Sequence, residues 1–90
     1  MSVQIFFIYA DGCKHCREAL MIIKSAIEKS KVECQVRELL FEDKVALNIA
    51  RKHGIDDLPG FVITPGEAVF VGENYTEDEI LDAIKNANSK

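Results

Sequence analysis

The sequence of 90 residues has no tryptophan, only two prolines, and no long hydrophobic run. Its longest unbroken apolar stretch, Ile5 to Ala10, is far shorter than the roughly 20 residues that a membrane-spanning helix needs. The first residues also lack the basic segment with which a secretory signal peptide begins. We therefore expect neither a membrane span nor a secretion signal.

Positive charge is also scarce. Lysine and arginine number 11 against 15 aspartates and glutamates, which gives a formal net charge of −4. An acidic chain without a basic block is a poor partner for nucleic acids and for anionic membranes. We therefore expect neither of them among its partners.

Cysteine occurs only three times, too rarely for the disulfide framework of a small secreted domain. The odd number also favours a cytoplasmic protein, whose thiols stay reduced unless they serve redox or metal chemistry. Hydrophobic residues make up 48% of the chain, which suits a globular fold and excludes general disorder. We expect a single domain over residues 1–90 that acts as a monomer.

Hydrophobic periodicity predicts elements in the order β-α-β-α-β-β-α. Val3 to Tyr9 is apolar on both sides and predicts a central strand, and the helical period from Cys13 to about Ser30 predicts a helix. Alternation from Val32 to Arg37 predicts a half-exposed edge strand, parallel to the first. A second helix is predicted to start at Glu42 or Asp43 and to stop at Gly54. It is followed by a predicted hairpin of Phe61–Ile63 and Ala68–Val71 and by a last helix capped by Thr76. We expect the tail from Asn86 to Lys90 to be frayed.

The residues that carry chemistry are Cys13-Lys14-His15-Cys16. Two cysteines at this spacing can close a disulfide, and Cys13 falls near the helix N-cap, where unpaired N–H groups and the helix dipole stabilise a thiolate. Lys14 and His15 add two possible cations, so we expect a more oxidising pair than one with neutral intervening residues. Nearby carboxylates would act in the opposite direction, and the candidates are Asp11, Asp56 and Asp57.

A pair of this kind can instead be half of a zinc site, which Cys34, His15 or His53 would have to complete. The spacing is not that of a zinc knuckle or ribbon. Strand alternation points Cys34 inward as a small buried hydrophobe, and His53 is placed to stabilise the end of the second helix. We therefore favour redox chemistry and expect no metal.

A Cys-x-x-Cys pair between a strand and a helix, followed by Leu58-Pro59 before a hairpin and a last helix, resembles the thioredoxin and glutaredoxin superfamily. The resemblance runs from Val3 to about Ala87 and is to the minimal, glutaredoxin-sized members. It implies the α/β thioredoxin fold, with a four-stranded mixed sheet flanked by three helices.

The resemblance also implies a thiol-disulfide oxidoreductase that needs no cofactor. Cys13 would attack a substrate disulfide, and Cys16 would resolve the mixed disulfide. Pro59 would follow a cis peptide bond and face the cysteines, and Leu58 would offer its backbone to an extended substrate. The implied partners are disulfide-containing proteins and an electron donor, either glutathione or a protein reductase. The alternative is a non-catalytic thioredoxin-like module that binds a partner or holds zinc.

Several positions depart from the patterns of the two subfamilies. Asp57-Leu58-Pro59 stands where glutaredoxins carry Thr-Val-Pro, and Glu73 follows Gly72 where they carry the second glycine of a glutathione-holding pair. Phe7 and Gly12 stand where thioredoxins carry a buried aspartate and a tryptophan. The changes at Leu58 and Glu73 favour a protein reductase over glutathione as donor.

Overall fold

Strand β1 (Val3–Tyr9) runs through the middle of the protein in the computed structural model, which describes residues 3–89. Its side chains are buried on both faces, with Ile5 and Phe7 on one and Ile8 on the other. A strand without a polar face lies inside a sheet that is covered on both sides. The predicted central strand is confirmed.

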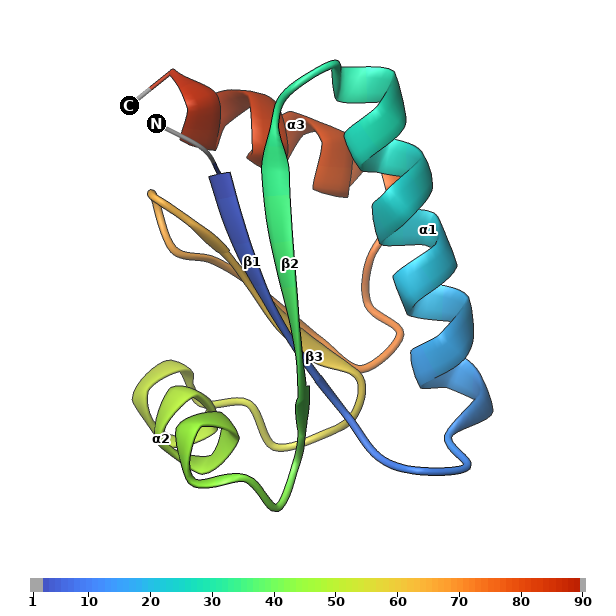
Figure 1. Ribbon diagram of the computed structural model, residues 1–90, viewed down its shortest axis with the longest axis vertical. Helices are drawn as coiled ribbons and strands as arrows, with labels where there is room; N and C mark the ends of the chain where they lie inside the picture. The colour runs from blue at the N-terminus through green and yellow to red at the C-terminus, as the bar shows by residue number, and fades with distance from the viewer. Residues whose placement is uncertain (1–2, 90) are drawn as a thin grey trace.

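β1 belongs to a four-stranded sheet of order β2-β1-β3-β4 (Figure 1). β2 (Cys34–Leu40) is an edge strand parallel to β1, and it begins two residues later than the predicted Val32. β3 (Gly60–Thr64) is antiparallel to β1, and β4 (Ala68–Val71) completes the hairpin. The predicted mixed sheet is confirmed.

Three helices flank the sheet, as predicted: α1 (Lys14–Ser30), α2 (Lys44–His53) and α3 (Glu77–Asn88). Asp43 caps α2 by accepting a hydrogen bond from the Val45 N–H, and Gly54 ends it with a φ of +68° that glycine adopts without strain. A capping box of Thr76 and Glu79 begins α3. Among residues 3–89, no helix combines the length and the hydropathy needed to cross a bilayer.

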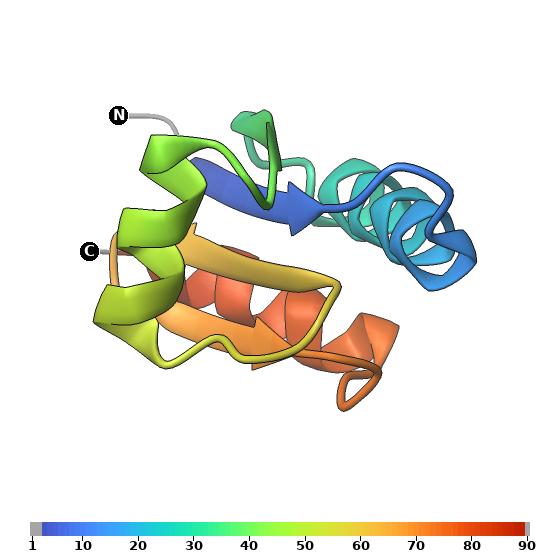
Figure 2. The same ribbon diagram turned by 90° about the horizontal axis from the view of Figure 1, so that it is seen from below.

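Two hydrophobic clusters fill the two faces of the sheet. α2 covers the smaller one, which consists of Ile8, Leu39, Ala46, Ile55 and Val62. α1 and α3 cover the larger one, and Figure 2 shows α2 across the strands from α1. The buried members of the larger cluster are Val3, Ile5, Phe7, Cys16, Ala19, Ile23, Ala26, Phe61, Ile63, Ile80, Ile84 and Ala87.

The prediction of a frayed C-terminal tail is wrong over residues 86–88. α3 continues to Asn88, because Ala87 extends the buried series of Ile80 and Ile84 by one more helical turn and is only 3% exposed. Lys90 lies outside the described residues.

Ile23 and Met21 provide a matched test of the larger cluster, since both lie on α1. Ile23 has no exposed surface, whereas Met21 is 70% exposed. We expect Ile23→Ala to lower the free energy of unfolding by about 2–5 kcal/mol and Met21→Ala to change it by less than about 0.5 kcal/mol. Urea unfolding of both variants measures the difference, and equal losses would contradict the burial of Ile23.

Candidate active site

The N-terminus of α1 carries the cysteine pair. Gly12 turns the chain with a φ of +76°, and Cys13 follows as the N-cap residue in an extended conformation. The sulfur of Cys13 accepts a hydrogen bond of 3.2 Å from the backbone N–H of Cys16. The predicted position of Cys13 at the helix cap is therefore confirmed, and its sulfur contacts one of the otherwise unpaired N–H groups of the first turn.

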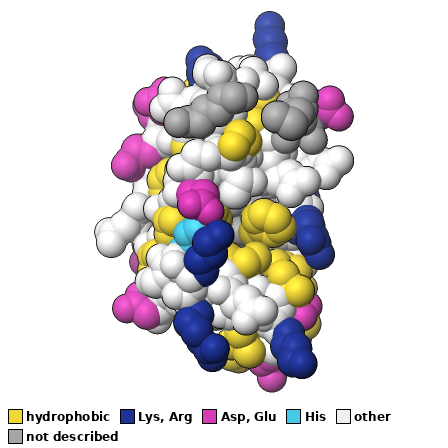
Figure 3. Space-filling view, turned by 90° about the vertical axis from the view of Figure 1, so that its left-hand side faces the viewer, with side chains coloured by type: hydrophobic (Ala, Val, Ile, Leu, Met, Phe, Trp, Pro, Cys, Tyr) yellow, Lys and Arg dark blue, Asp and Glu magenta, His cyan; other side chains and the backbone are white. Residues whose placement is uncertain are grey.

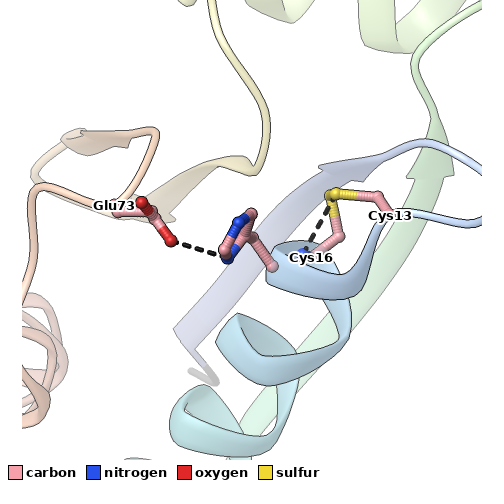
Figure 4. A network of polar contacts seen from close by, with 4 residues as sticks. Cys13, Cys16 and Glu73 are labelled. Carbon is pink, nitrogen blue, oxygen red and sulfur yellow. Dashed lines mark hydrogen bonds and ion pairs between the residues drawn. A yellow bond between two sulfur atoms is a disulfide. The ribbon is translucent and has the colours of Figure 1, made fainter.

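Cys13 and Cys16 form a disulfide, with their Cα atoms 5.3 Å apart (Figure 4). The two residues differ in accessibility. Cys16 is 3% exposed and is packed in the larger hydrophobic cluster, whereas Cys13 is half-buried. An external group can therefore reach Cys13 while Cys16 remains covered by the protein.

A pocket of about 210 Å³ lies beside the disulfide. Phe7, Tyr9 and Leu20 give it apolar walls, and Asp11 and Arg17 place opposite charges at its edge. Cys13 and Cys16 also line it. The pair thus borders a recess with both apolar and charged walls.

Pro59 lies near this pocket because of the register of the sheet. Ile8 of β1 pairs with Gly60 of β3, so Pro59 is beside the end of β1 that leads into the cysteine loop. The Leu58–Pro59 peptide bond is cis. The Pro59 carbonyl accepts a hydrogen bond of 2.7 Å from the N–H of Gly72, which ties the loop before β3 to the end of β4.

The backbone of Leu58 is less free than the sequence suggests. Its N–H donates a hydrogen bond of 2.9 Å to the carboxylate of Asp57, the preceding residue. The same carboxylate lies beside Gly72, where an added Cβ would be 3.2 Å from it. A substrate backbone could use the Leu58 N–H only by displacing Asp57.

His15 pairs with a residue that sequence reasoning treated only as a departure from the glutaredoxin pattern. Its Nδ1 lies 2.6 Å from Oε1 of Glu73, in the loop after β4 (Figure 4). The side chains are 58% and 66% exposed, so water and salt screen the pair. The sequence places His15 between the two cysteines, but its ring nitrogen is bound to a carboxylate from another loop.

Tyr75 anchors the loop that carries Glu73. Its ring packs edge-on against Phe61, with 5.6 Å between ring centroids. Partial burial, with Glu18 and Glu73 nearby, raises the pKa of the Tyr75 hydroxyl. Sequence periodicity gave no signal for the His15–Glu73 contact, since the two residues are joined only through the packing of this loop.

Lys14 is exposed, and within residues 3–89 it forms no ion pair. It therefore adds a solvated positive charge near Cys13. Asp56 and Asp57 both line a groove on the α2 side of the sheet, and the Asp57 carboxylate also lies beside Gly72, the residue before Glu73. The cysteine pair thus has charges of both signs around it.

Cys34 and His53 lie away from the pair. Cys34 is opposite Val3, and the length of β1, about 20 Å, separates it from the cysteine loop. His53 ends α2, where its Nε2 is 4.0 Å from a carboxylate oxygen of Glu67. In the part of the chain that the structure describes, no three His, Cys, Asp or Glu side chains are grouped closely enough to hold a metal ion. The residues that zinc would need are therefore not brought together.

A family model described as a thioredoxin domain matches residues 1–85. The match covers nearly the whole chain, and the chain belongs to this family. Together with the disulfide of Cys13 and Cys16, membership supports a redox role in general. No curated protein matches the sequence.

Solved structures agree with this family. A mutant thioredoxin from Halobacterium salinarum superposes with a TM-score of 0.70 at 22% identity, over 96% of this chain and 74% of that one. A thioredoxin-like protein from Clostridium perfringens gives 0.73 at 17% identity, over 99% and 73%. Thioredoxin 1 from Thermosipho africanus gives 0.65 at 16% identity, over 96% and 94%. At these identities the likeness shows the thioredoxin fold.

The His15–Glu73 pair predicts a small effect on redox equilibrium. Glu73→Gln removes a negative charge near the site, and this favours the Cys13 thiolate. It also takes from His15 the carboxylate that would stabilise an imidazolium, and this smaller effect acts in the opposite direction. Since exposed pairs contribute roughly 0.2–1 kcal/mol, we expect the reduction potential to rise by up to about 20 mV. Equilibration with graded glutathione buffers measures the shift.

The control is the same change in a His15→Gln background. If Glu73 also acts through His15, the opposing contribution is absent in the double variant and the shift should be larger there. A shift of equal size with and without His15 would show that Glu73 acts directly on the cysteines.

The half-buried position of Cys34 predicts an order of thiol reactivity. Burial raises the pKa of the Cys34 thiol, so its thiolate is scarce at neutral pH. After reduction, we expect iodoacetamide to modify Cys13 first and to modify Cys34 only as the pH rises. Mass spectrometry across a pH series measures this order, and unfolded protein, in which all three cysteines should react alike, is the control. Equal rates for Cys13 and Cys34 at neutral pH would contradict it.

Proposed function

We propose that the protein is a thiol-disulfide oxidoreductase of the thioredoxin family, with Cys13 as nucleophile and Cys16 as resolving thiol. The observation that carries the proposal is the unequal exposure of the two sulfur-bearing residues at the helix N-terminus. The accessible sulfur is also the one that accepts a hydrogen bond from the first turn of α1. This hydrogen bond and the helix dipole favour its thiolate.

The reaction begins with the reduced pair. The Cys13 thiolate attacks one sulfur of a substrate disulfide, a bond forms between them, and the other substrate sulfur leaves as a thiolate that takes up a proton. Cys16 then loses its proton and attacks the sulfur of Cys13. The second substrate thiolate leaves, and two electrons have passed from the protein to the substrate. A dithiol or thiol donor must reduce the pair again.

The surroundings of Cys13 suggest the roles of its neighbours. Leu58 and Pro59 would support the substrate, and its backbone would reach the Leu58 N–H by displacing the Asp57 carboxylate. Lys14 and His15 would adjust thiolate stability, with Glu73 compensating His15. The donor that we favour is a protein reductase, because acidic groups stand where glutathione, itself anionic, would bind in glutaredoxins.

The setting that we propose is the cytoplasm, where a reducing environment would keep the pair supplied with electrons. The third cysteine is half-buried and distant from the pair, so it would take no part in the cycle. We further propose that the protein acts as a monomer and as a single domain over residues 1–90.

Variants of the two cysteines test the mechanism. We expect Cys13→Ser to abolish the reduction of a disulfide substrate. Cys16→Ser should accumulate a mixed disulfide on Cys13, since the resolving thiol is gone. Mass spectrometry detects the trapped species, and Cys34→Ser is the matched control that should retain activity.

In thiol–disulfide buffers, a cooperative two-electron transition of Cys13 and Cys16 in the wild-type protein would support the proposed oxidoreductase. If Cys13→Ser still reduced the substrate, the proposed nucleophile would be wrong. If the thiols of Cys13 and Cys16 never paired, a non-catalytic binding module would replace the oxidoreductase.

A further inference from the structure

An apolar groove opens beside the candidate active site, on the α2 side of the sheet. It has a volume of about 380 Å³. Phe41, Leu47, Ile55 and Leu58 supply apolar walls, and Asp56 and Asp57 add two carboxylates. The groove lies on the opposite side of the sheet from most of the buried core, and the reaction described above uses only its edge, at Asp57 and Leu58.

The side chains around the groove are unusually exposed for their type. Phe41 is 44% exposed and Leu47 is 46% exposed, and Val45 between them is 42% exposed. In the part of the chain that the structure describes, five large hydrophobic residues are exposed, and these are three of them, the others being Met21 and Val69. Figure 3 shows that hydrophobic side chains reach the surface among charged ones on the side of the molecule that carries α2. Such clustering is typical of an interaction surface.

Two contacts link the walls of the groove to the cysteine site. The N–H of Phe41 donates a hydrogen bond of 2.8 Å to the carbonyl of Tyr9, which also lines the pocket beside Cys13. Leu58 packs against both hydrophobic clusters and so lies between the groove and the larger core that contains Cys16. A polypeptide held against Leu58 with its sulfur at Cys13 would therefore extend along the groove.

The charge of the groove indicates which side chains it would accept. Within residues 3–89, neither Asp56 nor Asp57 forms an ion pair. The loop that leads into α2 carries Glu42 and Asp43, and α2 itself begins with Lys44 and carries Arg51 and Lys52 in its last turn. A lysine or arginine of a bound segment would meet the two carboxylates that line the groove, whereas an acidic ligand would be repelled by them.

We propose that this groove selects protein disulfides in which an apolar residue and a basic residue lie beside the reacting cysteine. The apolar side chain would cover Phe41 and Leu47, and the basic one would pair with Asp56. The proposal rests on the proposed function and names its class of substrate. It also disfavours glutathione, whose two carboxylates would face the carboxylates of the groove.

Matched peptides test this selectivity. Three peptides of equal length carry one cysteine as a mixed disulfide with thionitrobenzoate, next to Leu-Arg, Leu-Glu or Ser-Arg. The reduced protein passes two electrons to each mixed disulfide and releases coloured thionitrobenzoate, so the rate is read directly. We expect the Leu-Arg peptide to react at least about fivefold faster than either of the others.

Variants of groove residues test whether the preference for the Leu-Arg peptide arises in the groove. Asp56→Asn should remove the preference for arginine over glutamate, and Leu47→Ser should remove the preference for leucine over serine. Two controls at exposed positions outside the groove, Asp78→Asn and Val69→Ser, should keep both preferences. Hydroxyethyl disulfide, which is neutral and too small to reach the groove, should react at the same rate with every variant.

The outcomes separate this proposal from the proposed function. If all three peptides react equally, or if Asp56→Asn and Leu47→Ser leave the preferences intact, the groove has no such role. A mixed disulfide of glutathione that reacts as fast as the Leu-Arg peptide would also overturn the proposal. A dimer that Leu47→Ser dissociates would assign the groove to a second copy of the chain. If reduced protein fails to react even with hydroxyethyl disulfide, the oxidoreductase function itself is wrong.

Discussion

The burial of β1 on both faces is the constraint on which the rest of the structure depends. Ile5 and Phe7 join the cluster under α1 and α3, while Ile8 joins the cluster under α2. Because both clusters need this strand, its position in the middle of the sheet is fixed. From the C-terminal end of β1 the chain turns at Gly12 and enters the first turn of α1. The cysteine pair is therefore held by the core of the protein.

The disulfide itself joins the core to the surface. Cys16 packs in the larger cluster, and Cys13 caps the helix from outside it. One side of the bond is thus fixed by apolar packing and the other by the hydrogen bond from the Cys16 N–H. This asymmetry suits a reaction in which one sulfur attacks a partner and the other reacts only after a mixed disulfide has formed.

Charge around the pair is mixed, and the loops after β4 and before β3 decide how it is arranged. Glu73 binds His15, while Asp57 binds the N–H of Leu58 and lies beside Gly72. The exposed apolar side chains near the start of α2 lie on the other side of Leu58. Acidic and apolar side chains therefore border the cysteine site on the side of Leu58. Side chains of this kind affect which partners approach a site more than they change the chemistry of thiol–disulfide exchange.

The sequence by itself determined the order of the elements, the parallel pair of strands, the hairpin and the position of Cys13 at a helix cap, whereas the joining of these strands in one mixed sheet came from the family resemblance. These follow from local signals: the unbroken apolar run of β1, the helical period after Gly12, and the capping residues Asp43 and Thr76. It misjudged the end of α3, because the burial of Ala87 depends on the neighbouring strands. It also missed the pairing of His15 with Glu73, the occupied N–H of Leu58 and the groove beside Phe41. Only the tertiary structure decided these three features. Each of them either joins segments that are distant in the sequence or depends on the conformation of an irregular loop. Hydrophobic periodicity carries no information about contacts between distant segments or about the conformation of loops.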